Sequence, residues 1–140
     1  MDTHWVVVAN HEVARLFQAA SRTGPLKEVD SLTDPTARMA VGDLESDAPG
    51  RAPGGGASEP KRNAKKQESI RFAKRIAEHV QSARQAGRFS RLHLLVEPNM
   101  MGLLRDAMDA PTRALVGHEL STNVATQSPA DIRTHLPELL

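Results

Sequence analysis

The sequence contains no cysteine, few aromatic residues and no long hydrophobic run. Without cysteine, the chain has no disulfide, no thiol nucleophile and no thiolate metal ligand. With one tryptophan, three phenylalanines and no tyrosine, its core must be built from aliphatic side chains. The hydrophobic runs are far shorter than the roughly 20 residues that span a bilayer, and the N-terminus lacks the basic and apolar regions of a signal peptide. We therefore expect a cytoplasmic protein that makes no contact with a membrane.

The first part of the chain has the pattern of an antiparallel meander. Residues 5–9 are continuous, apolar and β-branched, which predicts a central strand covered on both faces. Residues 14–20 follow after a short polar break, so a hairpin is the natural connection. Residues 26–32 follow the Gly24-Pro25 turn and have mixed polarity, which is typical of an edge strand.

The stretch from residue 67 to residue 108 organises the rest of the chain. Its first part predicts a helix, because small and aliphatic residues recur at spacings of three and four: Ile70, Ala73, Ile76, Ala77, Val80 and Ala83. Gly87 stands where a left-handed residue would end this helix. Residues 92–96 then form a short apolar run that predicts a buried strand, and a second helical pattern begins at Asn99.

The last part predicts a fifth strand over residues 117–125 and a short helix after Ser128, which is a capping serine followed by Pro129. The resulting order is β-β-β-α-β-α-β-α. This order predicts an α/β fold of ribonuclease H-like topology, with a mixed five-stranded sheet and helices packed on it. At 140 residues the chain is expected to form a single α/β domain.

A long polar segment, residues 34–66, interrupts this pattern. It contains four prolines and five glycines but almost no periodic apolar residues, so it buries too little apolar surface to offset its ordering entropy. We expect a flexible insert, and such an insert is a candidate site for a protein partner. Gly54-Gly55-Gly56 is not a phosphate-binding loop, because no Lys-Ser/Thr pair follows it.

Positive charge is concentrated next to this insert. From Glu59 to Arg91 there are ten basic residues and three acidic ones, although the formal net charge of the whole chain is only +1. Such a cluster can neutralise phosphates and bind nucleic acid without sequence preference; the alternative is an ordinary solvated helix face. The candidate nucleic-acid-binding residues are Lys61, Arg62, Lys65, Lys66, Arg71, Lys74 and Arg75.

Several segments resemble one known family across nearly the whole chain. They are residues 5–10 (WVVVAN), 14–17 (ARLF), 89–98 (FSRLHLLVEP), 101–105 (MGLLR) and 128–132 (SPADI), together with the long polar insert. These segments are similar to those of the bacterial host attachment proteins, described as required for attachment to host cells.

The resemblance implies a fold similar to the middle domain of archaeal and eukaryotic release factors and of Pelota, and hence a relation to translation or RNA. It also makes Arg15 and Arg105 secondary candidates for a polar binding surface, because both match the family pattern. Two departures weaken a catalytic reading. Asn10 stands where relatives often have an acid, and Gly55-Gly56 is followed by Ala57 instead of the release-factor glutamine, so peptidyl-tRNA hydrolysis is not expected.

No catalytic constellation is visible in the sequence. A ribonuclease H-type nuclease needs several carboxylates around two metal ions, whereas the strand ends offer only Asn10, Gln18, Glu97 and Glu119. The histidines lack metal-ligand spacing, and His93, inside an apolar strand, is expected to be a hydrogen-bonded core or edge histidine. We therefore expect a protein without enzymatic activity, metal or cofactor that binds RNA or the ribosome. The alternatives are a protein-interaction module that uses the insert, and a degenerate metal-dependent hydrolase; the sequence indicates no oligomeric state.

Overall fold

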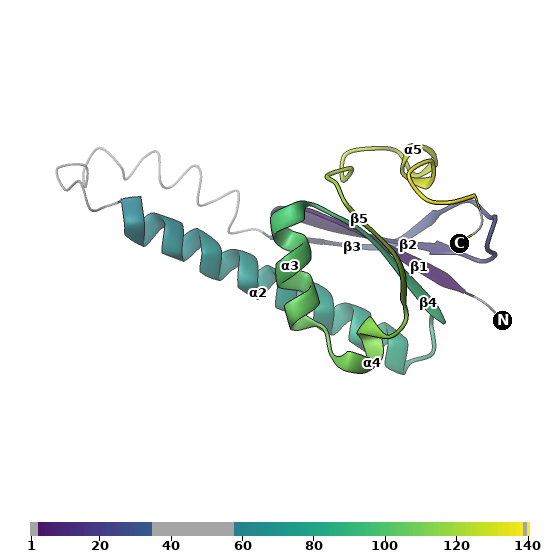
Figure 1. Ribbon diagram of the computed structural model, residues 1–140, viewed down its shortest axis with the longest axis horizontal. Helices are drawn as coiled ribbons and strands as arrows, with labels where there is room; N and C mark the ends of the chain where they lie inside the picture. The colour runs from purple at the N-terminus through teal and green to yellow at the C-terminus, as the bar shows by residue number, and fades with distance from the viewer. Residues whose placement is uncertain (1–2, 35–57, 139) are drawn as a thin grey trace.

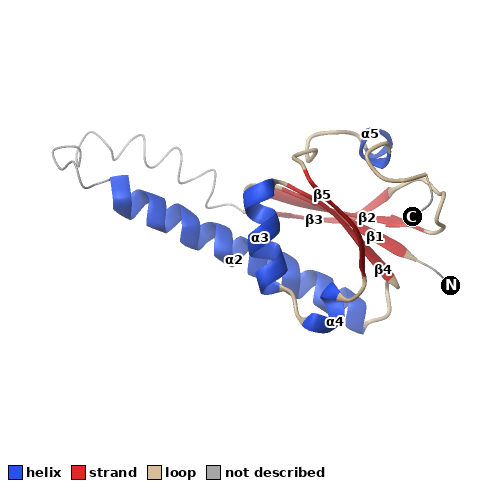
Figure 2. Ribbon diagram, in the orientation of Figure 1, coloured by secondary structure: helices blue, strands red, loops and turns tan. Residues whose placement is uncertain are grey.

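The computed structural model describes residues 3–34, 58–138 and 140, with the backbone alone for residues 58–63. These residues form a mixed five-stranded open sheet with helices packed on it (Figures 1 and 2), which confirms the expected α/β class. The strands are β1 (His4–Ala9), β2 (Val13–Ala19), β3 (Lys27–Thr33), β4 (Arg91–Val96) and β5 (Val116–Ser121). The helices are α2 (Ser58–Gln85), α3 (Pro98–Ala107), α4 (Ala110–Arg113) and α5 (Pro129–Arg133).

The strand order is β3-β2-β1-β4-β5. β1 pairs antiparallel with β2, and β2 with β3, as the predicted meander requires. β4 joins the other side of β1 in parallel, and β5 pairs in parallel with β4. β1, β4 and β5 therefore begin at the same end of the sheet, which we call the amino-end edge. They finish at the opposite end, which we call the carboxyl-end edge.

Strand sequences match their positions in the sheet. Every residue of the central strand β1 is buried, because both of its faces are covered. β3 is an edge strand, as predicted, and all but one of its residues are exposed. Its charged side chains, Lys27, Glu28 and Asp30, disfavour pairing with another chain.

Two cores lie on the two faces of the sheet. On one face, α2 and α3 pack over alternate strand residues such as Trp5, Val7 and Leu16. On the other face, α5 and the segments around it cover a second set, Val6, Val8, Phe17 and Leu95, through Val124, Ile132 and Leu136. Burying an aliphatic side chain of this kind contributes roughly 1.5–3 kcal/mol.

Helix ends follow local signals at several sites. Gly87 adopts a φ of 73° after α2, as its position predicted. Ser128 caps α5 by accepting a hydrogen bond from the Asp131 N–H, also as predicted. Glu97 caps α3 with both carboxylate oxygens, accepting hydrogen bonds from the N–H groups of Asn99 and Met100. The fifth strand is shorter than predicted and ends at Ser121, so that Val124 and Ala125 enter the second core from a loop.

One boundary of the predicted insert is wrong. The insert was expected to extend to Lys66, whereas α2 already begins at Ser58. Residues 64–67 of this helix are exposed, so they need no apolar periodicity, and strong helix formers such as Ala64, Lys65 and Gln67 suffice to continue it. Residues 35–57 lie outside the described residues. Among the described helices, none is long and apolar enough to cross a membrane.

Candidate functional site

The predicted basic residues on α2 form a solvent-exposed row. Lys65, Lys66, Arg71, Lys74 and Arg75 are all exposed. Within the described part of the chain, the side chains of the first four make no ion pair or hydrogen bond, whereas Arg75 donates to the Thr33 carbonyl oxygen at 3.1 Å. Lys61 and Arg62 belong to the same helix, but their side chains lie outside the described residues.

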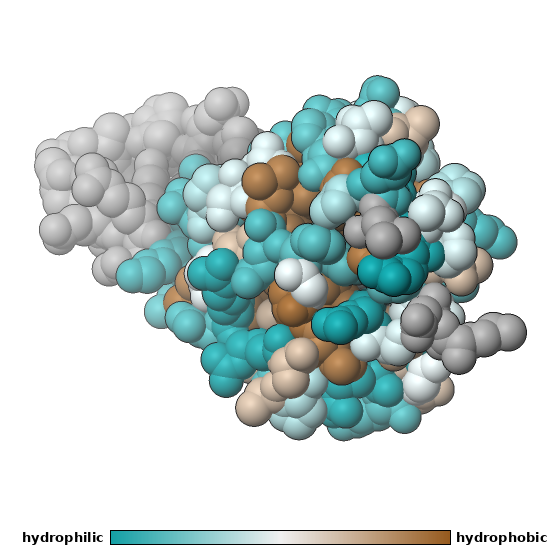
Figure 3. All heavy atoms as spheres, turned by 45° about the vertical axis from the view of Figure 1, so that its right-hand side comes forward, coloured by the Kyte–Doolittle hydropathy of each residue, from teal (hydrophilic) through white to brown (hydrophobic). Residues whose placement is uncertain are grey.

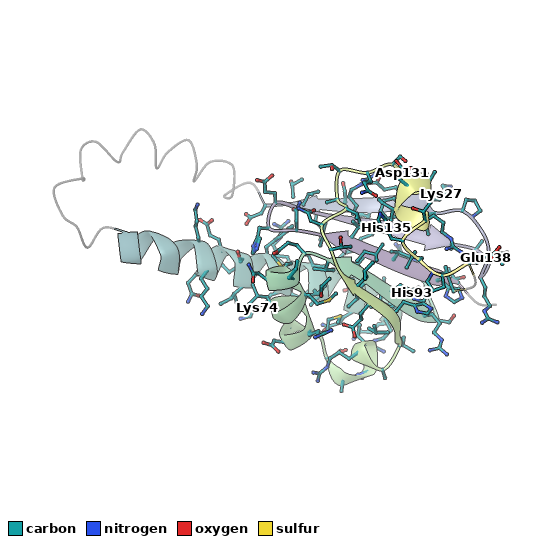
Figure 4. The ribbon with its side chains drawn as sticks, turned by 45° about the horizontal axis from the view of Figure 1, so that its top comes forward. Lys27, Lys74, His93, Asp131, His135 and Glu138 are labelled. Carbon is teal, nitrogen blue, oxygen red and sulfur yellow. The ribbon has the colours of Figure 1, made fainter. Side chains whose placement is uncertain are left out.

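α2 carries part of this row beyond the sheet. Ser69 of α2 contacts His11, which follows the carboxyl end of β1, and α2 then runs back toward the amino end of β4. The turns before Ser69 therefore project past the carboxyl-end edge of the sheet, as the teal helix shows at the left of Figure 1. Figure 4 shows Lys74 on the same helix, well separated from His93 near the other edge. Unpaired cations on a projecting helix are accessible to a large anionic partner.

The two secondary candidates lie in other surroundings. Arg15 packs against the face of the sheet opposite α2, where its guanidinium donates to the carbonyl oxygens of Ala125 (2.8 Å) and Gln127 (2.6 Å) and pairs with Glu28. Arg105 of α3 pairs with Glu119 of β5 at 2.7 Å. Both guanidinium groups are therefore engaged in contacts within the protein, unlike the unpaired cations of α2.

A polar row that the sequence analysis missed lies at the carboxyl-end edge. His11 Nε2 is 2.9 Å from Glu97 Oε2, and His11 Nδ1 is 3.0 Å from Ser69 Oγ. Since the carboxylate can only accept, a neutral imidazole here carries its proton on Nε2, and its Nδ1 accepts from the Ser69 hydroxyl. These contacts join the β1–β2 loop to α2 and to the start of α3.

The three side chains follow the serine–histidine–acid order that activates a serine nucleophile. Their surroundings nevertheless favour a structural role. Ser69 lies in the interior of α2, where backbone N–H groups are bonded within the helix and cannot stabilise an oxyanion. The N–H groups at the start of α3 are taken by Glu97. Within the described residues, no group of three His, Asp or Glu side chains could hold a metal ion.

Three histidines are stacked at the opposite, amino-end edge. The His93 ring lies between the rings of His4 and His118, with centroids 5.3 Å and 5.0 Å away. His93 is 1% exposed, and its Nδ1 accepts the His118 backbone N–H at 3.2 Å; the expected hydrogen-bonded core histidine is thus confirmed. Burial, followed by electrostatic repulsion from His118 and His4, lowers the pKa of His93 to about 4, so its ring is neutral at pH 7.

The fold and this distribution of charge define an α/β protein with a mixed sheet and a projecting basic helix. A family model described as "protein required for attachment to host cells" matches residues 5–136. The chain therefore belongs to this family, as the sequence resemblance indicated. No curated protein sequence matches the chain significantly.

Proposed function

We propose that this host attachment protein acts by binding the phosphate backbone of RNA, free or within the ribosome, through α2. The observation that carries the proposal is the set of four exposed cations without partners among the described residues, Lys65, Lys66, Arg71 and Lys74. Each cation that neutralises a phosphate releases a condensed counterion, so binding of this kind is salt-dependent and tolerant of sequence.

The topology supports the same proposal. A sheet ordered β3-β2-β1-β4-β5, with β4 and β5 parallel to β1, is compatible with the ribonuclease H-like topology and with a likeness to the release-factor and Pelota middle domain. We propose this relation, and with it a role in the cytoplasm close to translation.

We further propose that the protein is not an enzyme. The helical setting of Ser69 supports this, as does the pairing of Glu119, a strand-end acid, with Arg105 instead of with other carboxylates. A protein partner for the insert remains a prediction, because residues 35–57 lie outside the described residues.

The test is fluorescence anisotropy of a labelled structured RNA at several salt concentrations, with two matched triple variants. One carries Lys65→Ala, Lys66→Ala and Lys74→Ala on α2; the other carries Lys27→Ala, Arg88→Ala and Arg113→Ala, which are exposed cations on other parts of the fold. Each variant lowers the formal net charge by three, from +1 to −2, so a general charge effect is the same in both.

The wild type and the Lys27/Arg88/Arg113 variant should bind with the same salt dependence. The α2 variant should bind more weakly, and its slope of log K against log salt should be smaller by about 2 to 3, since each lost phosphate contact contributes about 0.7 in a single strand and about 0.9 in a duplex. Equal weakening of both variants, or no binding by the wild type at low salt, would overturn the proposal.

A further inference from the structure

The amino-end edge of the sheet contains a cavity of about 610 Å³, within the range of small-molecule sites. It lies where β1, β4 and β5 begin, at the end of the sheet opposite to the projecting part of α2. Its polar lining comes from His4, Arg22, Ser90, Arg91, His93 and His118. In Figure 3 this end of the molecule turns toward the viewer, and hydrophobic patches there are broken up by hydrophilic side chains.

The ionisable side chains of this lining are all basic. The lining contains two arginines and three histidines but no aspartate or glutamate. The Arg22 guanidinium is partly committed, because its Nε donates to the Leu140 carbonyl oxygen at 2.9 Å. The exposed Arg91 side chain makes no hydrogen bond or ion pair with any described residue, so it keeps its full set of donors for a ligand.

Hydrogen bonds locate the imidazole proton of the central histidine, His93. His93 Nδ1 accepts the His118 backbone N–H, so a neutral His93 carries its proton on Nε2. That proton is donated to His4 Nδ1, which lies 3.0 Å away. The rings are nearly parallel, at 12° and 20°, so they line the cavity side by side instead of converging on a metal ion.

The electrostatics of the cavity agree with its composition. Burial and then the charges of His118, His4, Arg91 and Arg133 lower the pKa of His93 to about 4. Two permanent cations, Arg91 and Arg133, therefore act on this buried ring, and a bound anion would offset their repulsion.

We propose that this cavity binds a small phosphomonoester, with the phosphate held by Arg91 beside the histidine stack. The planar guanidinium of arginine matches phosphate oxygens in a bidentate geometry. Because His93 is neutral, the three imidazole rings can lie close together. The volume of the cavity leaves room for an organic group beyond the phosphate. This proposal is independent of RNA binding by α2, since it uses different residues at the other end of the sheet.

The experiment is isothermal titration calorimetry of the full chain with AMP, inorganic phosphate, adenosine and acetate. AMP should bind more tightly than adenosine, and phosphate should bind while acetate does not. Arg91→Gln should weaken AMP and phosphate binding by about tenfold, the loss expected for one charge-assisted pair. The matched control Arg88→Gln, an exposed arginine outside the lining, should bind as the wild type does.

A second readout locates the ligand. In a histidine side-chain NMR titration, bound AMP should raise the pKa of His93, because an anion in the cavity stabilises the protonated ring. Equal affinity of Arg91→Gln and wild type, equal binding of adenosine and AMP, or a His93 titration unchanged by saturating AMP would overturn the proposal.

Discussion

His93 is a polar residue in the middle of a buried strand, and its surroundings make stability depend on pH. Its pKa is about 4 in the folded protein, against 6.5 for an unperturbed histidine. Between these values the unfolded chain binds more protons than the folded one, so stability falls as the pH decreases from 6.5 toward 4 and is unaffected by this group above 6.5. The full effect amounts to roughly 3 kcal/mol.

Urea denaturation of wild type and His93→Gln across this pH range measures the effect. Glutamine keeps a donor and an acceptor but does not titrate, so the stability difference between the two proteins should shift in favour of the variant as the pH falls. A difference that stays constant with pH would show that His93 titrates alike in both states.

Gly117 lies against the edge of the same ring. A Cβ atom there would be 3.0 Å from His93 Cε1 and 3.3 Å from Nδ1, and His93 cannot move freely because both of its ring nitrogens are hydrogen-bonded. Gly117→Ala should therefore destabilise the protein by about 1–3 kcal/mol through overpacking. Gly102, exposed within α3, has nothing within 4 Å of its Cβ position, so Gly102→Ala should stabilise by about 0.5–1 kcal/mol. Thermal or urea denaturation of the two variants tests this, and equal changes would contradict it.

Side chains that meet across the sheet could not be identified from the sequence. His11 and Ser69 are 58 positions apart, and His4 and His93 are 89 apart. Their contacts depend on strand register and on the position of α2, and neither is encoded in local periodicity. Arg15 illustrates the same limit: its position in the family pattern suggested a binding surface, whereas its partners Ala125 and Gln127 come from the far end of the chain.

Among the elements, α2 shows what periodicity can and cannot detect. The apolar spacing from Ile70 to Ala83 predicted the packed part of the helix, because burial selects one face. Residues 64–67 are exposed and have no such selection, so composition favoured a loop, although Ala64, Lys65 and Gln67 are good helix formers. The strands β1 and β4 were predicted for the same reason. Both are buried on both faces of the sheet, so their sequences are continuous apolar runs.

This contrast predicts uneven hydrogen exchange along α2. Residues 64–67 are exposed, whereas the later turns contain the buried Phe72, Ile76 and Val80. Amides of residues 64–67 should exchange at least about a hundredfold faster than those of residues 76–83, since packing supplies most helix stability. Hydrogen exchange with mass spectrometry measures both segments in one sample, and equal protection would mean that another surface covers the projecting turns.

For the whole molecule, the two proposed sites lie at opposite ends of one sheet. β1 and β4 are each six residues long. The amino-end and carboxyl-end edges of the sheet are therefore separated by about 16 Å, at roughly 3.3 Å per residue. Substitutions at this separation with no shared partner are expected to act additively. The projecting cations on α2 and the Arg91 side chain should therefore act on different ligands.

The last prediction follows from this separation. Arg91→Gln should leave RNA affinity and its salt slope unchanged. The Lys65/Lys66/Lys74 variant should leave AMP affinity unchanged. The variant that combines all four substitutions should lose RNA affinity and AMP affinity by the same factors as the separate variants do. Anisotropy with RNA and calorimetry with AMP on all three variants provide the comparison. If Arg91→Gln also weakened RNA binding, the RNA path would extend around the sheet from α2 to the cavity, and the two surfaces would form one interface.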